Sequence, residues 1–353
     1  MNEKATEIAG VGVGDVRITD EEVIATYQRI VNPDAAKKFD KTSGWFERYN
    51  GKLADPEQGE RYLRAIRNTI LIPDRELPGK KVLDIGCGFG LTCSTLAMLG
   101  AAEVHGVDMF DEMVDTVKAY LPEIPNHERI HPRTGSAYAL PYEDNQFDVA
   151  LTFEALSHFL NPFDCLAEAY RVLRPGGVYI ISDDNNGANP SVVQENQEVW
   201  DRFENGPPTN DIHGHRVLEP YVEKRRRIVL EAYPDMKESD ADELARRTSF
   251  MTKEEVLSAV EQYKQDGTLP ESFYGPGKCP IEPEQGQYIE NLLNPLVLKD
   301  QLEQCGFRVE LEAYFGGASR GGALLMANNL LNMLLPARLL LRYSDGFRIR
   351  AYK

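Results

Sequence analysis

The chain of 353 residues is poor in cysteine and in basic charge, and it opens without a long hydrophobic run. Its five cysteines are odd in number and form no C-x-x-C pair, which favours a reduced, cytoplasmic setting over a disulfide framework. The formal net charge of −17 argues against a nucleic-acid partner, because phosphate contacts need a basic surface. Residues 1–19 lack the apolar core of a signal peptide, so no secretory leader is expected.

Two segments differ in composition from the rest of the chain, one rich in basic residues and the other rich in leucine. Residues 224–227 read Lys-Arg-Arg-Arg, and we interpret them as one solvated helix face rather than a phosphate site, because only Tyr221 offers a ring nearby. Residues 323–341 are rich in leucine, but three asparagines, Pro336 and Arg338 make them too polar for a membrane span. We expect this stretch to pack in the core or between the subunits of a homo-oligomer; peripheral membrane contact is the alternative.

The most informative feature present is an apolar strand that runs into a turn with glycine at every second position. Residues 82–90 read VLDIGCGFG, so Gly86, Gly88 and Gly90 alternate. Glycine at a strand-to-helix turn lets the backbone approach a ligand closely and adopt dihedrals that a side chain forbids. The G-x-G-x-x-G spacing that seats a pyrophosphate on a helix N-terminus is absent. The turn therefore indicates a nucleotide-type cofactor other than a dinucleotide.

With Asp84 at its start, the D-x-G-x-G-x-G pattern resembles motif I of the class I S-adenosylmethionine-dependent methyltransferases, in particular the small-molecule, type 11-like group. Three further landmarks follow in the order of that family. They are a short strand ending in Asp108, a Gly-Ser-Ala turn at residues 135–137 followed by a strand from Phe147, and a Leu-Arg-Pro-Gly-Gly turn and strand at residues 173–181. The resemblance covers residues 77–184, with a weaker match near the C-terminus.

This resemblance implies that the chain binds S-adenosylmethionine and releases S-adenosylhomocysteine. The glycine turn would make room for the methionine portion, Asp84 would orient that turn or the ammonium group, and Asp108 would hold the ribose hydroxyls. Ser136 stands where the family usually has an aspartate that receives the adenine amino group, and a serine accepts that bond more weakly. The cofactor-binding residues so implied are Asp84, Gly86, Gly88, Gly90, Asp108, Met109, Ser136, Ala137, Phe153 and Glu154, the last two through their backbone.

Short apolar strands alternate with helices from Lys80 onward, which predicts an α/β fold with a doubly wound parallel sheet. The resemblance extends this to a Rossmann-like, seven-stranded methyltransferase sheet, with an N-terminal helical cover and a large, mostly helical insertion after strand five. The expected strands are residues 81–85, 103–107, 129–133, 147–153, 178–183, 308–314 and 347–352. The expected units are residues 1–76 (tail and helical cover), 77–184 (cofactor-binding core), 185–293 (helical cap over the acceptor) and 294–353 (completion of the sheet).

Helical periodicity and capping signals locate several helices in these units. We expect a first helix with Asp20 as its cap, and another that begins with the capping box at Thr252. Further helices are expected over 56–71, 91–99, 216–233, 240–247 and 295–305. The aromatic segment 44–50 is interpreted either as part of a lid or as ordinary packing. The glycine-rich run 316–322 is interpreted either as a loop facing the substrate or as a plain surface loop.

Methyl transfer from a sulfonium is an in-line displacement, so the protein mainly has to position the reactants and exclude water. We therefore expect transfer to a small-molecule acceptor, in the first place at oxygen. A hydroxyl acceptor benefits from a base, for which His158 is the first candidate and His213 and His215 the second. The alternatives are a structural or lid role for His158 and a surface position for the other two.

Other functions stay open at this point. The rival enzymatic reading is carbon or nitrogen methylation of a lipid-like acceptor brought by residues 323–341. The non-enzymatic reading is a cofactor-binding regulatory protein that has lost transfer. Residues 183–185, Asp-Asp-Asn, are similar to the magnesium ligands of catechol-type methyltransferases, but Glu154 replaces the aspartate expected after strand four, and we expect no metal.

Overall fold

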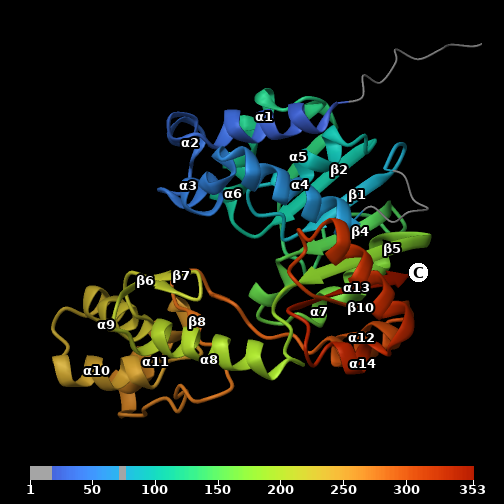
Figure 1. Cartoon of the computed structure of the whole chain (residues 1–353). Helices are drawn as coiled ribbons and strands as arrows, with labels where there is room; N and C mark the ends of the chain where they lie inside the picture. The colour runs from blue at the N-terminus through green and yellow to red at the C-terminus, as the bar shows by residue number, and fades with distance from the viewer. Residues whose placement is uncertain (1–17, 71–76) are drawn as a thin grey trace, which may run out of the picture.

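The computed structural model describes residues 18–70 and 77–353 and is built around one seven-stranded sheet (Figure 1). Residues 1–17, most of the expected tail, and residues 71–76, where the helix predicted over 56–71 was to end, lie outside the described residues. The strands of the sheet are β1 Lys81–Ile85, β2 Glu103–Asp108, β3 Ile130–Thr134, β4 Phe147–Phe153, β5 Leu173–Asp183, β10 Arg308–Tyr314 and β11 Gly346–Tyr352.

The strand order is β10-β11-β5-β4-β1-β2-β3. Strands β1 to β5 pair in parallel, whereas β11 runs antiparallel to both β5 and β10 and lies between them. This confirms the expected methyltransferase-type sheet, including the insertion of the last strand beside the fifth. The strand order reverses between β1 and β4, so their carboxyl ends open the crevice in which such sheets bind ligands.

Helices cover both faces of the sheet, which explains why β1 and β4 read as nearly continuous apolar runs. Alternate strand residues enter two separate buried clusters: Val82 and Val104 join one, Leu83 and Val107 the other. The helices around the sheet are α5 Leu91–Met98, α6 Asp111–Tyr120, α7 Asp164–Val172, α12 Pro295–Gln304, α13 Gly322–Leu334 and α14 Ala337–Leu340, with 3-10 turns η2 Leu121–Glu123, η3 His127–Arg129 and η4 Leu156–His158.

The N-terminal cover consists of α1 Asp20–Val31, α2 Pro33–Phe39, α3 Trp45–Asn50, η1 Gly51–Ala54 and α4 Pro56–Ile70. The expectation that Asp20 caps the first helix is wrong: Thr19 is the cap and forms a capping box with Glu22, while Asp20 is the first helical residue. Two tyrosines join the cover to the helix after the glycine turn. The hydroxyl of Tyr27, on α1, lies 2.5 Å from the Thr95 hydroxyl of α5. The hydroxyl of Tyr62, on α4, lies 2.9 Å from the Thr92 hydroxyl of α5.

Between β5 and α12 the chain forms a mostly helical group that lies beside the sheet, shown in yellow and orange in Figure 1. Its elements are α8 Pro190–Asn205, β6 Thr209–Ile212, β7 His215–Val217, α9 Tyr221–Ala232, α10 Glu238–Arg246, α11 Lys253–Asp266, β8 Ile281–Glu282 and β9 Gln287–Tyr288. The single helix predicted over 216–233 is wrong at its start, because His215–Val217 pairs with β6 and Pro220 precedes α9. The capping box at Thr252 is confirmed.

The basic run at residues 224–227 lies on α9, and its four side chains point in different directions around the helix. Lys224 pairs with Glu282, Arg226 with Asp242, and Arg227 with Glu219 and Glu284, so acidic side chains neutralise the run. Arg225 is fully buried and pairs with Glu204 and the Ser249 hydroxyl. The expectation of one solvated face is therefore wrong for Arg225, because four consecutive residues cannot share one side of a helix.

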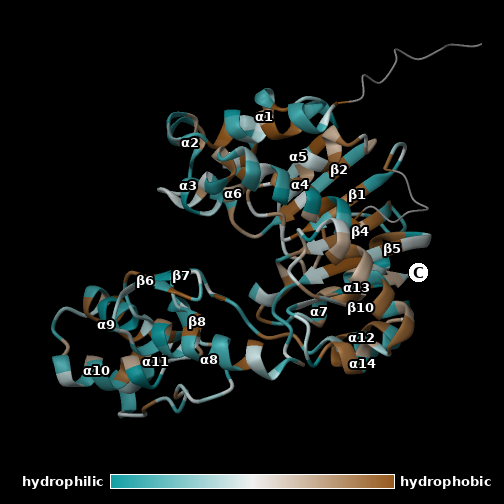
Figure 2. Ribbon diagram, in the orientation of Figure 1, coloured by the Kyte–Doolittle hydropathy of each residue, from teal (hydrophilic) through white to brown (hydrophobic). Residues whose placement is uncertain are grey.

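The leucine-rich stretch at residues 323–341 forms α13 and α14 against the edge strand β10. Most of its large apolar side chains are exposed, and only Leu340 and Leu341 reach the core, so the expectation of core packing is wrong for the rest. In Figure 2 the ribbon of this part of the chain contains brown segments, the colour of apolar residues. Among the described residues, no helix has both the length and the apolarity that crossing a bilayer requires.

Candidate cofactor and acceptor site

The glycine turn connects β1 to α5 and needs glycine at all three alternating positions. Gly86, Gly88 and Gly90 have φ angles of 76°, 51° and 64°, in the left-handed region that side chains disfavour. The three positions differ in their surroundings. A Cβ on Gly90 would lie 2.9 Å from Val117 of α6, whereas a Cβ on Gly88 would meet nothing within 4 Å. Gly90 thus permits close helix packing, and Gly88 borders free space.

Asp108 at the end of β2 is held against this turn. One carboxylate oxygen accepts the Gly88 N–H at 2.8 Å and the other accepts the Phe110 N–H at 3.1 Å. Burial raises the pKa of Asp108 above its usual value. Each oxygen keeps a further lone pair, so the carboxylate can also accept from two hydroxyl groups of a ligand beside Gly88.

Asp84 lies beneath the turn and is almost completely buried. The Cys93 thiol of α5 donates to its carboxylate at 3.4 Å, and burial raises the pKa of Asp84 to about 7. This bond joins the end of β1 to α5, the helix that follows the turn.

The residues expected around the adenine lie on the other side of the turn. Ser136 accepts the Tyr138 N–H at 3.1 Å, Ala137 packs against the second buried cluster, and Met109 is exposed. A Cβ on Gly86 would lie 3.1 Å from the ring of Phe159. Phe159 itself meets the ring of Tyr138 edge to face, so two aromatic side chains that the motifs did not single out border this side of the turn.

A cavity of about 500 Å³ opens between the glycine turn, the N-terminal cover and the ends of β4 and β5. Gly86, Gly88 and Phe89 form one part of its wall, and Phe153 and Glu154 form another. The wall is completed by Tyr49, Asn50, Lys52, Leu53, Gln58, Arg61, Tyr62 and Ala65 of the cover, Cys87, Leu91 and Thr92 next to the turn, Asp184, and Gly317, Ala318 and Ser319.

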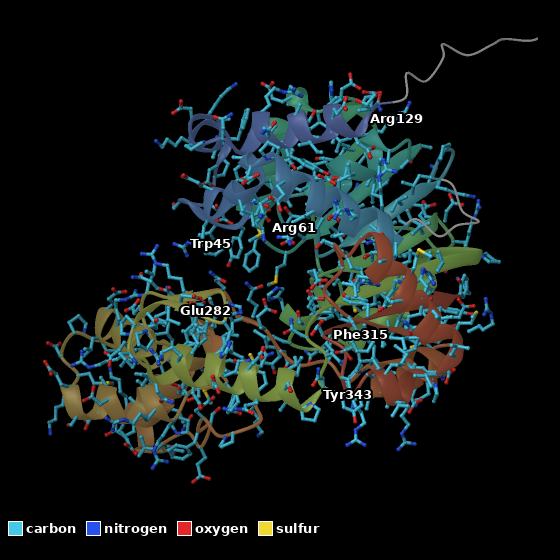
Figure 3. The ribbon with its side chains drawn as sticks, viewed as in Figure 1. Trp45, Arg61, Arg129, Glu282, Phe315 and Tyr343 are labelled. Atoms are coloured by element: carbon cyan, nitrogen blue, oxygen red, sulfur yellow. The ribbon has the colours of Figure 1, made fainter. Side chains whose placement is uncertain are left out.

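Two segments with open interpretations therefore reach this cavity. The aromatic segment 44–50 contributes Tyr49, and the glycine-rich run before α13 contributes Ser319. In Figure 3, Arg61 lies on the side of α4 that faces the insertion. The cover and the C-terminal loop thus both help to enclose the space beside Gly88.

Carboxylates gather where β4 and β5 end. Glu154 follows β4 with a φ of 49°, and its Oε2 accepts the Asp184 N–H at 3.1 Å. Its Oε1 is buried and has no hydrogen-bond partner among the described residues. Burial, reinforced by the charges of Asp184 and Asp183, raises the pKa of Glu154 well above its usual range. Asp183 is fully buried, and burial raises its pKa to about 6.

The three candidate histidines are not together. His158 lies beyond β4, where its Nδ1 donates to the Tyr288 carbonyl at 3.1 Å, which leaves the Nε2 lone pair free. His215 of the insertion is near enough for the charge of His158 to help lower its pKa, although burial is the larger cause. His213 is exposed and pairs with Glu198 at 2.8 Å, so it lies on the surface of the insertion. His158 is absent from the wall of the 500 Å³ cavity.

The side chains considered for magnesium are engaged in other bonds. Both oxygens of Asp183 accept backbone N–H groups, from Ser157 and Asn185. The Asn185 amide donates to Glu290 of the insertion. Residues 183–185 thus connect the end of β5 to its surroundings.

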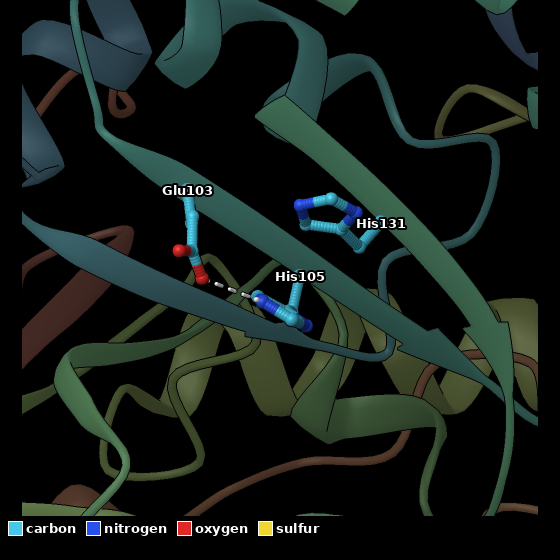
Figure 4. Close-up of side chains that lie close together, drawn as sticks. All are labelled: Glu103, His105 and His131. Carbon is cyan, nitrogen blue, oxygen red and sulfur yellow. Dashed lines mark hydrogen bonds and ion pairs between the residues drawn. The ribbon is translucent and has the colours of Figure 1, made fainter. Parts of the chain in front are cut away.

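Another cluster with metal-ligand character lies at the start of β2, at the opposite end of this strand from Asp108. Glu103, His105 and His131 offer ligand atoms within 4.8 Å of one another (Figure 4). His131 is the register partner of His105 on β3. Lys81 already lies 3.0 Å from the Glu103 carboxylate and neutralises it, so this cluster carries its own counter-charge.

Comparison with known proteins adds to this geometry. Residues 83–181 match the family model described as a methyltransferase domain. The (+)-O-methylkolavelool synthase of Herpetosiphon aurantiacus is 33% identical over 106 residues, covering 30% of this chain and 38% of the relative. A ubiquinone biosynthesis O-methyltransferase of Maricaulis maris is 32% identical over 162 residues, covering 44% and 63%. The 24-methylenesterol C-methyltransferase 2 of Arabidopsis thaliana is 32% identical over 103 residues, covering 29% and 28%.

This chain therefore spans less than two thirds of the length of these relatives. The matched residues contain the glycine turn, Asp108 and the end of β4. Together with the seven-stranded sheet, they identify the chain as one that carries a class I S-adenosylmethionine-dependent methyltransferase domain.

Proposed function

We propose that this protein transfers the methyl group of S-adenosylmethionine to a hydroxyl oxygen of a small molecule held in the 500 Å³ cavity. One observation carries the proposal: Gly88 of the glycine turn and Glu154, whose Oε1 is buried without a partner, border the same cavity. A space for the cofactor and a group able to take a proton are thus next to each other.

The residues present fit the cofactor. The free space at Gly88 accommodates close approach of a ligand, and the Asp108 carboxylate beside it suits a pair of ribose hydroxyls. Ser136 and Ala137 would border the adenine, and Asp84, bonded to Cys93 of α5, would orient the turn. When bound, S-adenosylmethionine supplies an electrophilic methyl group on a sulfonium.

Glu154 is the group that we assign to the acceptor. The Asp184 N–H fixes one carboxylate oxygen, so the other is presented in a defined direction. Its raised pKa makes it a stronger base than an ordinary glutamate, and it would take the proton of the acceptor hydroxyl as the new bond forms. Tyr62 and Phe153 line the cavity and would exclude water.

Glu154 thus replaces His158 as the first candidate base, because His158 does not line the cavity. Two of the relatives carry names that specify O-methylation, and one carries a name that specifies C-methylation. The two carboxylates of the lining, Glu154 and Asp184, favour a second candidate, an amine acceptor, whose ammonium form they would bind before one of them takes its proton. A carbon acceptor has no comparable support from the cavity.

The test is to incubate the protein with heavy-methyl S-adenosylmethionine and a metabolite extract, and to analyse the products by mass spectrometry. A methyl ether or ester among the labelled products would support the proposal, and a labelled amine would support the second candidate. Cofactor binding by calorimetry without any labelled product would count against both and favour the regulatory alternative. The same incubation without protein is the control.

A further inference from the structure

Helix α13 is attached to the sheet by its polar side. Asn328 is buried, and its side-chain oxygen accepts the Phe315 N–H at 3.1 Å. The Asn332 amide accepts the Ala313 N–H at 2.9 Å and donates to the Ala313 carbonyl at 2.7 Å. Because β10 is an edge strand, these amides satisfy backbone groups at a free edge of the sheet. Two of the three asparagines that make this stretch too polar for a membrane span thus face inward.

As a consequence, the apolar side of α13 and α14 faces outward. Met326 and Met333 are 74% exposed and Leu334 is 65% exposed. We call the surface formed by Leu324, Met326, Leu330, Met333, Leu334 and Leu339 the C-terminal apolar face; all six are exposed. Of the sixteen large hydrophobic residues that are exposed in the described chain, nine lie between residues 324 and 343. Such a concentration marks an interaction surface.

The charges within the segment that forms this face have one sign. The chain contains 56 acidic residues, yet none lies between Glu312 and Asp345. Two exposed arginines, Arg338 and Arg342, flank the apolar side chains. Tyr343 is 68% exposed and projects from the outer end of α14 (Figure 3). Leucine and methionine flanked by arginine and tyrosine are typical of segments that lie in a membrane interface.

We propose that α13 and α14 dock this protein peripherally on a bilayer with anionic headgroups. The C-terminal apolar face enters the boundary between headgroups and acyl chains, and Arg338 and Arg342 lie among the lipid phosphates. The 13 residues of α13 make a helix of about 20 Å, too short to cross the about 30 Å of hydrocarbon, so the helix lies in the interface.

A second copy of the chain fits this face less well. A two-fold interface presents the same surface of both copies to each other. It would bring together two copies each of Arg338 and Arg342, on segments that contain no acidic residue. Anionic headgroups supply the missing negative charge.

Docking also determines where the cavity lies. Gly317, Ala318 and Ser319 line the cavity and come directly before α13. On a docked protein, this wall of the cavity is separated from the lipid surface by a single short loop. The docking does not depend on methyl transfer and can be tested without it.

The test is flotation of the full chain with vesicles, either of phosphatidylcholine alone or of phosphatidylcholine mixed with phosphatidylglycerol. Three proteins accompany the wild type. The first carries Met326→Glu, Met333→Glu and Leu334→Glu, the second carries Arg338→Glu and Arg342→Glu, and the control carries Leu218→Glu and Phe273→Glu, two exposed positions in the insertion. Cofactor binding and circular dichroism show that each protein is folded.

We expect the wild type and the control to float with the mixed vesicles and the first variant to stay in solution. The arginine variant should bind mixed vesicles at least about tenfold more weakly, because each basic residue near an anionic surface contributes about 1 kcal/mol. Failure of the wild type to float, or equal flotation of wild type and apolar-face variant, would overturn the proposal. A dimeric wild type that becomes monomeric in the first variant without any vesicle binding would assign the face to a second copy. If the first variant does not fold, the arginine variant, which changes only exposed side chains, tests the proposal. Binding to mixed vesicles as strong as that of the wild type would then overturn it.

Discussion

At the scale of single residues, the three glycines of the turn have the same backbone conformation but different neighbours. Gly88→Ala and Gly90→Ala each put a methyl group on a left-handed residue, at a cost of about 1–2 kcal/mol. At Gly90 the methyl group also collides with Val117, which should lower the free energy of unfolding by about a further 1–3 kcal/mol. At Gly88 it enters the free space of the cofactor. We expect denaturation to show Gly90→Ala as the less stable variant and calorimetry to show Gly88→Ala as the weaker binder; the reverse ranking would contradict both assignments.

Glu154→Gln keeps the shape of the side chain and removes its ability to take a proton. A base must be ionised to act, and the pKa of Glu154 is raised, so kcat/KM of the wild type should rise with pH through that raised pKa. We expect the variant to lose about 10²–10⁴-fold in kcat and to lack this rise, with cofactor affinity retained. His158→Gln is the matched comparison. Should it abolish the pH dependence while Glu154→Gln preserves it, the base would be His158.

Asp84 makes stability depend on pH. Its pKa is raised from 3.8 to about 7 in the folded protein, so the folded state holds the proton more tightly than the unfolded chain. The free energy of unfolding contributed by this group therefore falls as pH rises from about 4 to about 7, by about 4 kcal/mol at most. Asp84→Asn should remove this fall and be more stable than wild type above that range. Urea denaturation on both sides of the range measures it, with the exposed Asp115→Asn as control.

At the scale of elements, α13 offers a sharp comparison. Asn332 bonds to both backbone groups of Ala313, whereas its neighbour Asn329 is exposed. Asn332→Leu leaves these groups of β10 without partners and should lower stability by about 1–3 kcal/mol, with faster hydrogen exchange in Gly322–Leu334. Asn329→Leu should change neither quantity. Equal effects of the two variants would mean that the amides do not hold the helix.

The sequence predicts the sheet well where the physics is local. Residues 81–85, 147–153 and 308–314 form strands with the expected bounds, because the first two are mainly apolar and the third alternates apolar with charged residues. The fifth strand begins earlier than expected, at Leu173. The Pro-Gly-Gly sequence lies within β5, where the register of its pairing with β4 shifts between Phe147 and Val149. This pairing depends on the neighbouring strand and cannot be read from the local sequence. Helix α8 was missed, although Asn189 before Pro190 is a capping signal.

The site is predictable only in part for the same reason. Spacing alone locates the glycine turn and Asp108. The contact between Glu154 and Asp184 cannot be predicted from spacing. The two residues meet because β4 pairs with β5, with Phe153 opposite Ser182. From the sequence we expected only the backbone of Glu154 to contact the cofactor. The proposal that its side chain acts as the base rests on the pairing of β4 with β5 in the structure.

At the scale of the whole molecule, the insertion has a core of its own, formed by Val229, Leu244, Val256 and their neighbours. Its buried Arg225 is neutralised by Glu204. Glu204→Gln leaves that charge uncompensated and should destabilise the insertion by about 3–5 kcal/mol. We expect a separate early unfolding transition in calorimetry and unchanged cofactor affinity. Glu238→Gln, which affects an exposed pair with Arg226, should give a single transition; a single transition for Glu204→Gln would mean that the insertion and the sheet unfold together.

The chain enters and leaves this insertion at one place. Gly187 donates to the Leu293 carbonyl at 2.8 Å, and Leu293 donates to the Asn185 carbonyl at 3.0 Å, so both crossings run side by side. A short turn could join them without disturbing β5 or α12. Segments with adjacent ends are those that proteins exchange most readily. The insertion can therefore be replaced as a unit while the seven-stranded sheet and its glycine turn stay unchanged, which offers a route to a new helical neighbour for the sheet by recombination rather than by point mutation.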